Sequence, residues 1–134
     1  VCVGTDINPT AVEYLRTNAE KNGVKDRVTA INGDVRERAT EYTDWADRIV
    51  MNLPHSADEF LATAVELATE ECTIHYYDIQ AEPDIYEPGE QAIRTVAEPE
   101  YAVTVESRRR VRSYAPGEYN VVLDVTLTRT GDNI

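Results

Sequence analysis

Asp6, Asp34 and Asn52 each follow a short apolar run in this sequence. The carboxyl ends of strands border the ligand crevice of an open α/β sheet, so we expect these side chains to point into one crevice. An acidic residue at such a strand end commonly accepts hydrogen bonds from ribose hydroxyls, and its charge strengthens each bond. Asp34, after Gly33, can instead accept from the exocyclic amine of an adenine. Together they favour a nucleotide-type cofactor.

Each of these residues also has a purely structural interpretation. Asp6 stands at the start of a helix and can interact with the helix dipole. Asp34 is a common turn residue. Asn52-Leu53-Pro54 can be a strand-to-loop turn, in which the proline stiffens the backbone. The functional interpretation of Asn52 is that its carboxamide grips a polar group of the substrate without adding charge.

No glycine-rich phosphate loop and no P-loop lysine occur in the sequence. Their absence disfavours a nucleotide triphosphatase and a dehydrogenase, and a methyl donor with an adenosine moiety and no phosphates fits better. His55 and His75 are the only histidines, too few for a zinc site, so we expect no metal.

The elements that must position these residues alternate along the chain. Helical spacing between caps at Asn8-Pro9 and Asn22-Gly23 indicates the first helix. Two long alternating runs around the turn 115–118 predict an antiparallel hairpin. We expect strands at 1–5, 27–32, 47–52, 72–78, 101–114 and 119–128, and helices at 9–22, 57–69 and 90–97. This order predicts an α/β fold, a doubly wound Rossmann-like sheet with helices on both faces, in one domain of residues 1–130 with a tail at 131–134.

The composition is strongly acidic, with 25 acidic and 13 basic residues and a net charge of −12. Lys21 and Lys25 are the only lysines, and we expect such a surface in a halophilic protein from a salt-rich cytoplasm. Cys2 and Cys72 lie in expected strands and are predicted to be buried thiols of a reducing, cytoplasmic compartment. No run is long and apolar enough to cross a membrane, so we expect no membrane partner.

Four segments resemble the archaeal tRNA (guanine-37 N1)-methyltransferase family, also called the Trm-five or Met-ten-like family. The segments are Asp6-Ile7-Asn8-Pro9 with the helix after it, Asn32-Gly33-Asp34-Val35-Arg36-Glu37, Asp47 to Pro54, and Ile74-His75-Tyr76-Tyr77-Asp78. The segment from Val111 to Asp124 resembles the closing hairpin of the same family. Asn-Leu-Pro with Ile-His-Tyr-Tyr is fairly specific, whereas the Asp and Gly-Asp motifs are generic to class I methyltransferases.

The resemblance implies a class I methyltransferase that uses S-adenosylmethionine (SAM). It assigns Asp6 and Ile7, with the adjacent Asn8, to the ribose, and Asp34 and Val35 to the adenine. It places Asn52 beside the methionine moiety and the target guanine, and makes Asn52 and Pro54 the catalytic residues. The implied reaction is methyl transfer to N1 of guanine 37 in tRNA.

The family's general base, an upstream Glu, and its first strand and glycine loop have no counterpart in the sequence. We therefore expect the chain to be a C-terminal piece of the enzyme, inactive alone. One alternative is the related aminocarboxypropyl transferase of the wyosine pathway. Another is a non-catalytic, tRNA-binding module with a methyltransferase-like fold.

The expected partner is the anticodon loop of tRNA, bound by a monomer. Arg108, Arg110 and Arg112 alternate along one expected strand and are predicted to contact phosphates from one face. The alternative is a solvated face that balances the acidic surface. Tyr76 and Tyr77 lie near a strand end, where aromatic rings can stack on a flipped base or pack beneath a helix.

Overall fold

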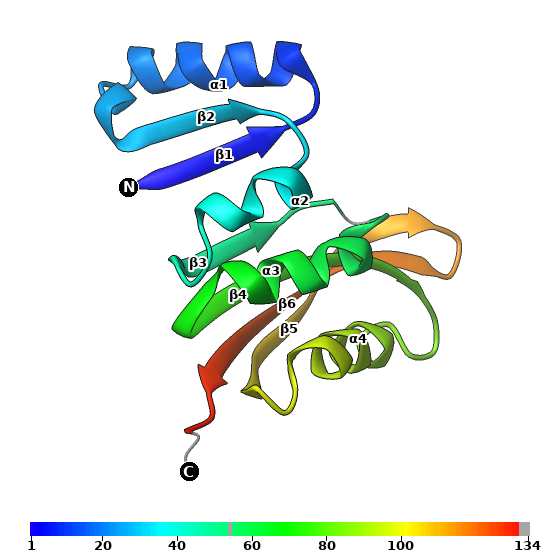
Figure 1. Ribbon diagram of the computed structural model, residues 1–134. Coiled ribbons are helices and arrows are strands. Elements are labelled where there is room, and N and C mark those ends of the chain that lie inside the picture. The colour runs from blue at the N-terminus through cyan, green and yellow to red at the C-terminus, as the bar shows by residue number, and fades with distance from the viewer. Residues whose placement is uncertain (54, 132–134) are drawn as a thin grey trace. The chain divides into compact units, whose positions relative to one another are not determined.

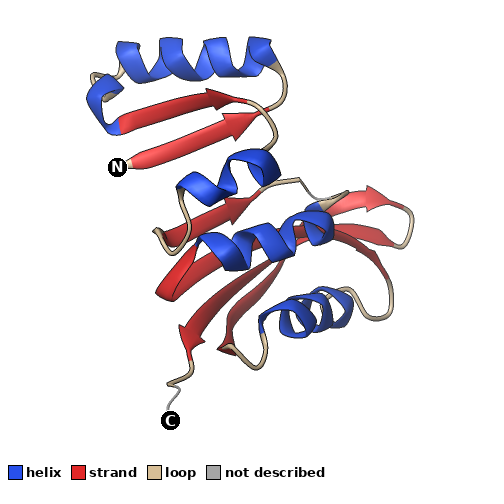
Figure 2. Cartoon of the chain, viewed as in Figure 1, coloured by secondary structure: helices blue, strands red, loops and turns tan. Residues whose placement is uncertain are grey.

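The computed structural model describes residues 1–53 and 55–131. The chain divides into two compact units, Val1–Glu41 and Tyr42–Ile134, each of which is described by itself below. Figure 1 labels the helices and strands, and Figure 2 distinguishes the two kinds of element by colour. None of the described helices is long and apolar enough to span a membrane.

The first unit is a helix packed on a parallel strand pair. Strands β1 (Cys2–Asp6) and β2 (Val28–Asn32) are parallel and in register from Cys2 opposite Val28 to Asp6 opposite Asn32. Helix α1 (Pro9–Lys21) connects them. The Asn8 side chain accepts from the Thr10 N–H, which caps the helix as the sequence predicted. The rest of the unit is short helices: η1 (Lys25–Arg27), α2 (Val35–Arg38) and η2 (Ala39–Glu41).

The second unit is built on a mixed sheet of four strands in the order β3-β4-β6-β5. Strands β3 (Ala46–Met51) and β4 (Ala68–Ala81) are parallel. Strand β6 (Glu118–Arg129) lies between β4 and β5 (Tyr101–Ala115) and is antiparallel to both. The predicted C-terminal hairpin is thus confirmed, and its second strand is inserted into the sheet. The helices are η3 (Ala57–Phe60), α3 (Leu61–Leu67) and α4 (Glu87–Ala97).

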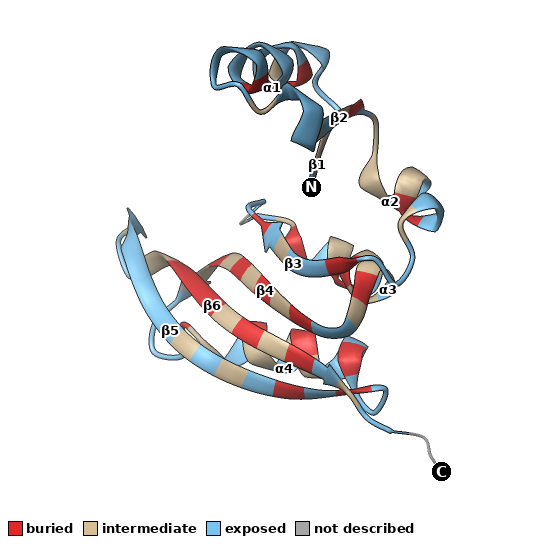
Figure 3. Cartoon of the chain, turned by 90° about the vertical axis from the view of Figure 1, so that its left-hand side faces the viewer, coloured by how far each residue is buried: buried red, intermediate tan, exposed pale blue. Residues whose placement is uncertain are grey.

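The core of the second unit lies between α3, α4 and one face of the sheet. From Cys72 to Asp78 in β4 and from Leu123 to Leu127 in β6, buried residues alternate with less buried ones, as Figure 3 shows, because successive side chains point to opposite faces. Tyr76 is on the buried face and is 1% exposed, so it packs under the helices. The fully buried core includes Leu61, Cys72, Ile74, Ile93, Leu123, Val125 and Leu127. Within the described part of this unit, both α3 and α4 pack against this one face.

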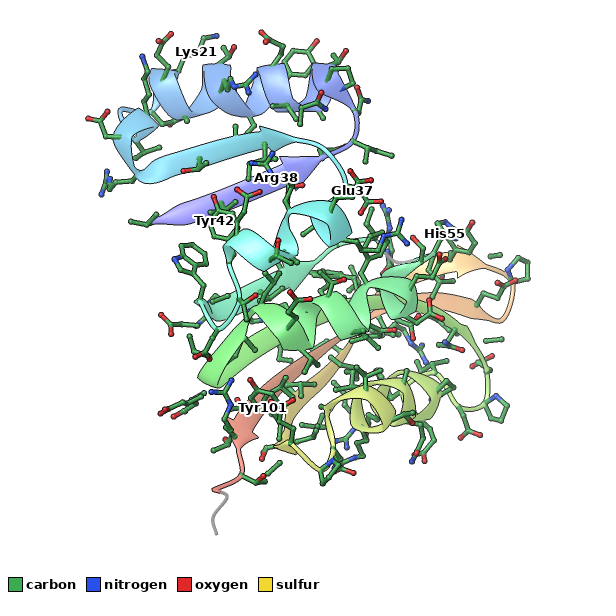
Figure 4. All side chains as sticks on the ribbon, viewed as in Figure 1. Lys21, Glu37, Arg38, Tyr42, His55 and Tyr101 are labelled. Carbon is green, nitrogen blue, oxygen red and sulfur yellow. The ribbon has the colours of Figure 1, made fainter. Side chains whose placement is uncertain are left out.

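Hydrogen bonds around the buried Tyr101 hydroxyl join the first residue of β5 and the last residue of β6 to the start of β4. The Tyr101 hydroxyl lies 3.0 Å from the carbonyl oxygen of Ala68 and 2.7 Å from Nη2 of Arg129. Arg129 also donates to Asp44 at 2.9 Å. Figure 4 shows Tyr101 at the end of the sheet opposite to His55.

Several expected boundaries were wrong, and the strand expected at 72–78 extends from Ala68 to Ala81. The helix expected at 57–69 ends at Leu67, because Ala68 has extended dihedral angles and pairs with Ala46. Helix α4 begins at Glu87 instead of residue 90, because Pro88 occupies its first turn, where a missing N–H costs nothing.

Two predictions of burial were also wrong. Cys2 is exposed in the described unit, because β1 is paired there only with β2. The short apolar run that forms β3 is typical of a strand buried on both faces, yet Val50 is 58% exposed. Ile49 and Met51 face the core while Val50 between them does not, so this part of β3 alternates.

Candidate functional site

The carboxyl end of the β1–β2 pair brings together the residues predicted to bind a nucleoside. Asn32 donates from Nδ2 to the carbonyl oxygens of Asp6 and Ile7, both at 3.1 Å. The Gly33 N–H donates to the Asp6 carbonyl at 2.9 Å. These bonds tie the chain after β1 to the chain after β2, so Asp6 and Asp34 lie at the same end of the pair.

The Asp6 side chain is held at this end by the chain that follows it. Its Oδ1 accepts from the Asn8 N–H at 2.9 Å, which leaves the exposed carboxylate able to accept further hydrogen bonds. Ile7 is 74% exposed. An exposed carboxylate beside an exposed aliphatic side chain suits a ligand that has hydroxyls next to an apolar ring.

The Asp34 carboxylate is held by Arg36. Its Oδ1 accepts from the backbone N–H and from Nε of Arg36 at 2.9 and 3.0 Å, and its Oδ2 accepts from Nη2 at 2.7 Å. The side-chain bonds first, and the backbone bond second, hold the pKa of Asp34 below its ordinary value. The group stays ionised, and its remaining lone pairs can accept from an amine. Val35 follows as the first residue of α2.

Asn52 belongs to the second unit, where it follows the last residue of β3, Met51, and is exposed. Pro54 lies outside the described residues. His55 comes next, and its Nε2 is 3.3 Å from the Tyr114 hydroxyl. The meeting of Asn52 with Asp6 and Asp34 in one crevice stays a prediction.

The arginines of β5 are divided between the two faces of the sheet. Arg110 lies opposite Val121, a core residue, and therefore points to the helix-covered face, which Arg108 shares. The register shifts after Arg110, so Arg112 lies opposite Asn120 on the other face. An extra residue in a strand inverts the side of the residues beyond it. The prediction that all three arginines share one face is wrong for Arg112.

Two of these arginines already have partners. Arg108 forms a two-pronged ion pair with Glu90 of α4, whose side chain is only 12% exposed. The guanidinium of Arg110 lies over the Tyr119 ring, 3.9 Å from its centroid. Arg112 is exposed. Of the three, Arg112 is the arginine with the fewest competing contacts among the described residues.

The face of the sheet away from the helices carries a polar network that sequence reasoning missed. His75 Nδ1 is 2.7 Å from Asp124 Oδ1, and Ser107 donates to Asp124 Oδ2 at 2.6 Å. The other ring nitrogen, Nε2, is 2.6 Å from Nη1 of Arg48. A guanidinium only donates, so Nε2 accepts and the proton of neutral His75 lies on Nδ1. These residues come from four strands, and only the strand pairing could have revealed the network.

Asp124→Asn is expected to destabilise the protein by about 1–2 kcal/mol at neutral pH, since hydrogen bonds to a charged group are lost. Bonds from His75, then Ser107, lower the pKa of Asp124. A carboxyl whose pKa is lowered by folding stabilises the fold at pH values above its ordinary pKa. This stabilisation is lost as the pH falls through the lowered pKa. Urea denaturation of the wild type and of Asp124→Asn should therefore show that the difference between their free energies of unfolding becomes smaller in acid. The exposed control Asp84→Asn should show no such trend.

Comparison with known proteins gives the family. Residues 1–106 match the TRM5/TYW2 methyltransferase domain. The chain belongs to the TRM5/TYW2 methyltransferase family. Trm5b, a tRNA (guanine(37)-N(1))-methyltransferase of Pyrococcus abyssi, is 41% identical over 121 residues, which cover 89% of the chain and 35% of Trm5b. A tRNA(Phe) (4-demethylwyosine(37)-C(7)) aminocarboxypropyltransferase of Methanocaldococcus jannaschii is 33% identical over 91% of the chain and 48% of its own length.

Solved structures of the family confirm the α/β methyltransferase fold. The M. jannaschii TYW2 structure in complex with AdoMet superposes with a TM-score of 0.88 at 32% identity, over 96% of this chain and 57% of that one. Trm5b of P. abyssi superposes with a TM-score of 0.86 at 39% identity, over 94% of this chain and 37% of Trm5b. The family is one of SAM-dependent methyltransferases, in agreement with the predicted cofactor. The chain spans between a third and a half of the length of these two curated relatives.

Proposed function

We propose that the protein transfers a methyl group from SAM to N1 of guanine 37 in tRNA. The observation that carries the proposal is the exposed Asn52 directly after β3, in the Asn-Leu-Pro sequence that favours methyl transfer. The 41% identity to Trm5b supports the proposal. The fold shared with a Trm5 solved in complex with tRNALeu also supports it: the TM-score is 0.80 at 31% identity, over 94% of this chain and 34% of that one.

The cofactor fits the residues at the β1–β2 end. The exposed Asp6 carboxylate can accept from both ribose hydroxyls, and the exposed Ile7 side chain can cover the apolar side of the nucleoside. Asp34 is kept ionised by Arg36 and can accept from the adenine amine, next to Val35. Asn8 holds the first turn of α1 in place. When bound, SAM supplies an electrophilic methyl group.

Asn52 positions the acceptor base in this proposal. A carboxamide donates and accepts on one planar group, so it can pair with the polar edge of guanine while adding no charge beside a cationic sulfonium. Met51, the residue before Asn52, packs in the core. This packing anchors the backbone there and limits the movement of Asn52. Positioning of this kind lowers the barrier because the reactants meet in a productive geometry.

Aminocarboxypropyl transfer is the second candidate, because a TYW2 structure superposes as well as Trm5b does. The full-length protein should be incubated with tRNA and SAM labelled either in the methyl group or in the carboxyl group. We expect only the methyl label to enter tRNA, with S-adenosylhomocysteine as the second product. Transfer of the carboxyl label, with methylthioadenosine released, would instead identify the second activity. Transfer of neither label would favour a binding module.

Arg112→Ala in the full-length protein is expected to lower the salt dependence of tRNA affinity by about one phosphate contact, a change of about 0.7 in the slope of log affinity against log salt. Arg108→Ala is the matched control, because Glu90 already neutralises that guanidinium. Filter binding over a range of KCl concentrations measures both slopes. Equal slopes for wild type and Arg112→Ala would mean that Arg112 does not contact a tRNA phosphate.

A further inference from the structure

The second unit contains an open cavity of about 580 Å³ at the carboxyl end of β4. Tyr76 forms part of its wall and lies opposite Met51, the residue before Asn52. The cavity therefore begins beside the strand end that carries Asn52. Its walls come from β4, the loop after β3, η3, the first turns of α4, and the β5–β6 hairpin. The lining residues include His55, Asp58, Asp78, Gln80, Pro88 and Tyr114.

One wall of the cavity is aromatic. Tyr114 is 52% exposed although it is a large ring. The His55 ring meets it edge to face, with centroids 5.2 Å apart. Figure 4 shows His55 at the end of the sheet where the hairpin turns. An exposed ring held by a neighbour is a surface on which a flat ligand can stack.

The floor of the cavity carries a buried carboxylate. Asp78 is 8% exposed, and it accepts from the Ile79 N–H and from Gln80 Nε2, both at 3.0 Å. Asp58 and Glu118 add two further carboxylates, and no Arg or Lys is among the lining residues in the described part of the chain. Such a cavity repels phosphate and attracts a ligand that donates hydrogen bonds.

The burial of Asp78 is costly, which indicates a use beyond folding. Burial raises the pKa of its carboxyl, and the Asp58 charge acts in the same direction, while the bonds from Gln80 and Ile79 oppose both. Replacement by a neutral residue of the same shape should therefore stabilise the fold at neutral pH. Gly89 leaves room for the carboxylate, because a Cβ there would lie 3.1 Å from its Oδ2.

A metal ion does not explain these carboxylates. Among the described residues, no three His, Cys, Asp or Glu side chains are grouped so that they could hold a metal. A flexible ammonium group would use the carboxylates and could lie over a ring, but it would leave most of the flat aromatic surface uncovered. A planar ring that bears an amine uses both, and a nucleobase with an exocyclic amine is such a ligand.

We propose that this cavity binds the base of a nucleotide adjacent to the reacting one in tRNA, with Tyr114 stacked on the ring and Asp78 accepting from its exocyclic amine. The inference rests on the proposed function, because it assumes a tRNA loop at the Asn52 strand end. The cavity would be a specificity site for a base that flanks the reacting one. Through it, Asp78 and Tyr114 would select the tRNA sequence around the reacting nucleotide.

The test compares full-length wild type with Asp78→Asn on tRNAs in which one flanking base at a time lacks its exocyclic amine. Loss of the amine at one flanking position should lower kcat/KM about tenfold for wild type, because a hydrogen bond to a charged group is lost. The same change should have little effect on Asp78→Asn. The exposed control Asp84→Asn should behave as wild type does. Equal losses in wild type and Asp78→Asn, or no loss at any flanking position, would overturn the proposal.

A second pair of variants tests the stacking. Tyr114→Phe should keep kcat/KM near that of wild type, whereas Tyr114→Ala should lower it about tenfold. Equal kcat/KM values for Tyr114→Phe and Tyr114→Ala would mean that Tyr114 does not stack on the base. Calorimetric affinity for SAM should be the same in all variants. Failure of wild type to bind SAM or to modify tRNA would reject the proposed function, whereas normal modification without an amine effect would reject only the cavity's role.

Discussion

Asn52→Ala in the full-length protein is expected to lower kcat/KM for tRNA methylation about a hundredfold, the usual loss when one positioned hydrogen-bonding group is removed from an active site. Asn52 is exposed at the end of β3, and it carries no part of the core. Its removal should therefore leave the stability of the fold unchanged. Initial rates at several tRNA concentrations, together with thermal unfolding, measure the two effects separately.

The matched control is Asn18→Ala, an exposed asparagine on α1. We expect wild-type rates from it, since a surface amide of a helix has no part in the reaction. Asn52→Asp is a second informative variant, because it keeps the shape and adds a charge next to the substrate. If Asn52→Ala methylates tRNA as fast as wild type, the role of Asn52 in positioning guanine is wrong.

Leu123→Ala is expected to lower the free energy of unfolding by about 3 kcal/mol. Leu123 is fully buried in β6, the strand between β4 and β5, and its side chain packs in the core that α3 and α4 share. A methyl group in its place leaves a cavity that neighbours on a rigid sheet cannot fill. Urea denaturation followed by circular dichroism measures the change.

Val111→Ala is the control for this substitution, because Val111 is 47% exposed on β5. Its loss should change stability by less than about 0.5 kcal/mol. Equal destabilisation by the two substitutions would mean that the side of β6 assigned to the core is incorrect.

The strands and the polar residues at their ends could be predicted because local sequence controls both. Alternating apolar residues predicted the hairpin, and Asn8 with Pro9 predicted the start of α1 to the residue. The same reasoning placed Asp6 and Asp34 at one end of a parallel pair, which the register confirms. It failed where pairing overrode local preference: Ala68 and Thr69 have helical neighbours but begin β4.

The cavity at the end of β4 left only weak signals in the sequence. The partner of His55 in the cavity wall, Tyr114, is 59 residues away along the chain, so no local pattern links the two. Asp78 directly follows Tyr76 and Tyr77 within β4, and a carboxylate after two aromatic residues is a weak sign of a polar site. Its burial depends on α4 covering the sheet, which no local pattern reports.

The sequence alone determined the family resemblance, the α/β class, the cofactor class and the residues at the strand ends, because these follow from motifs and periodicities within a few residues. Only the tertiary structure decided that β6 lies between β4 and β5, that a register shift sends Arg112 to the face opposite Arg110, and that His75 meets Asp124. These facts depend on which strands pair and in which register. Pairing is set by the packing of residues far apart along the chain, so sequence periodicity does not contain it.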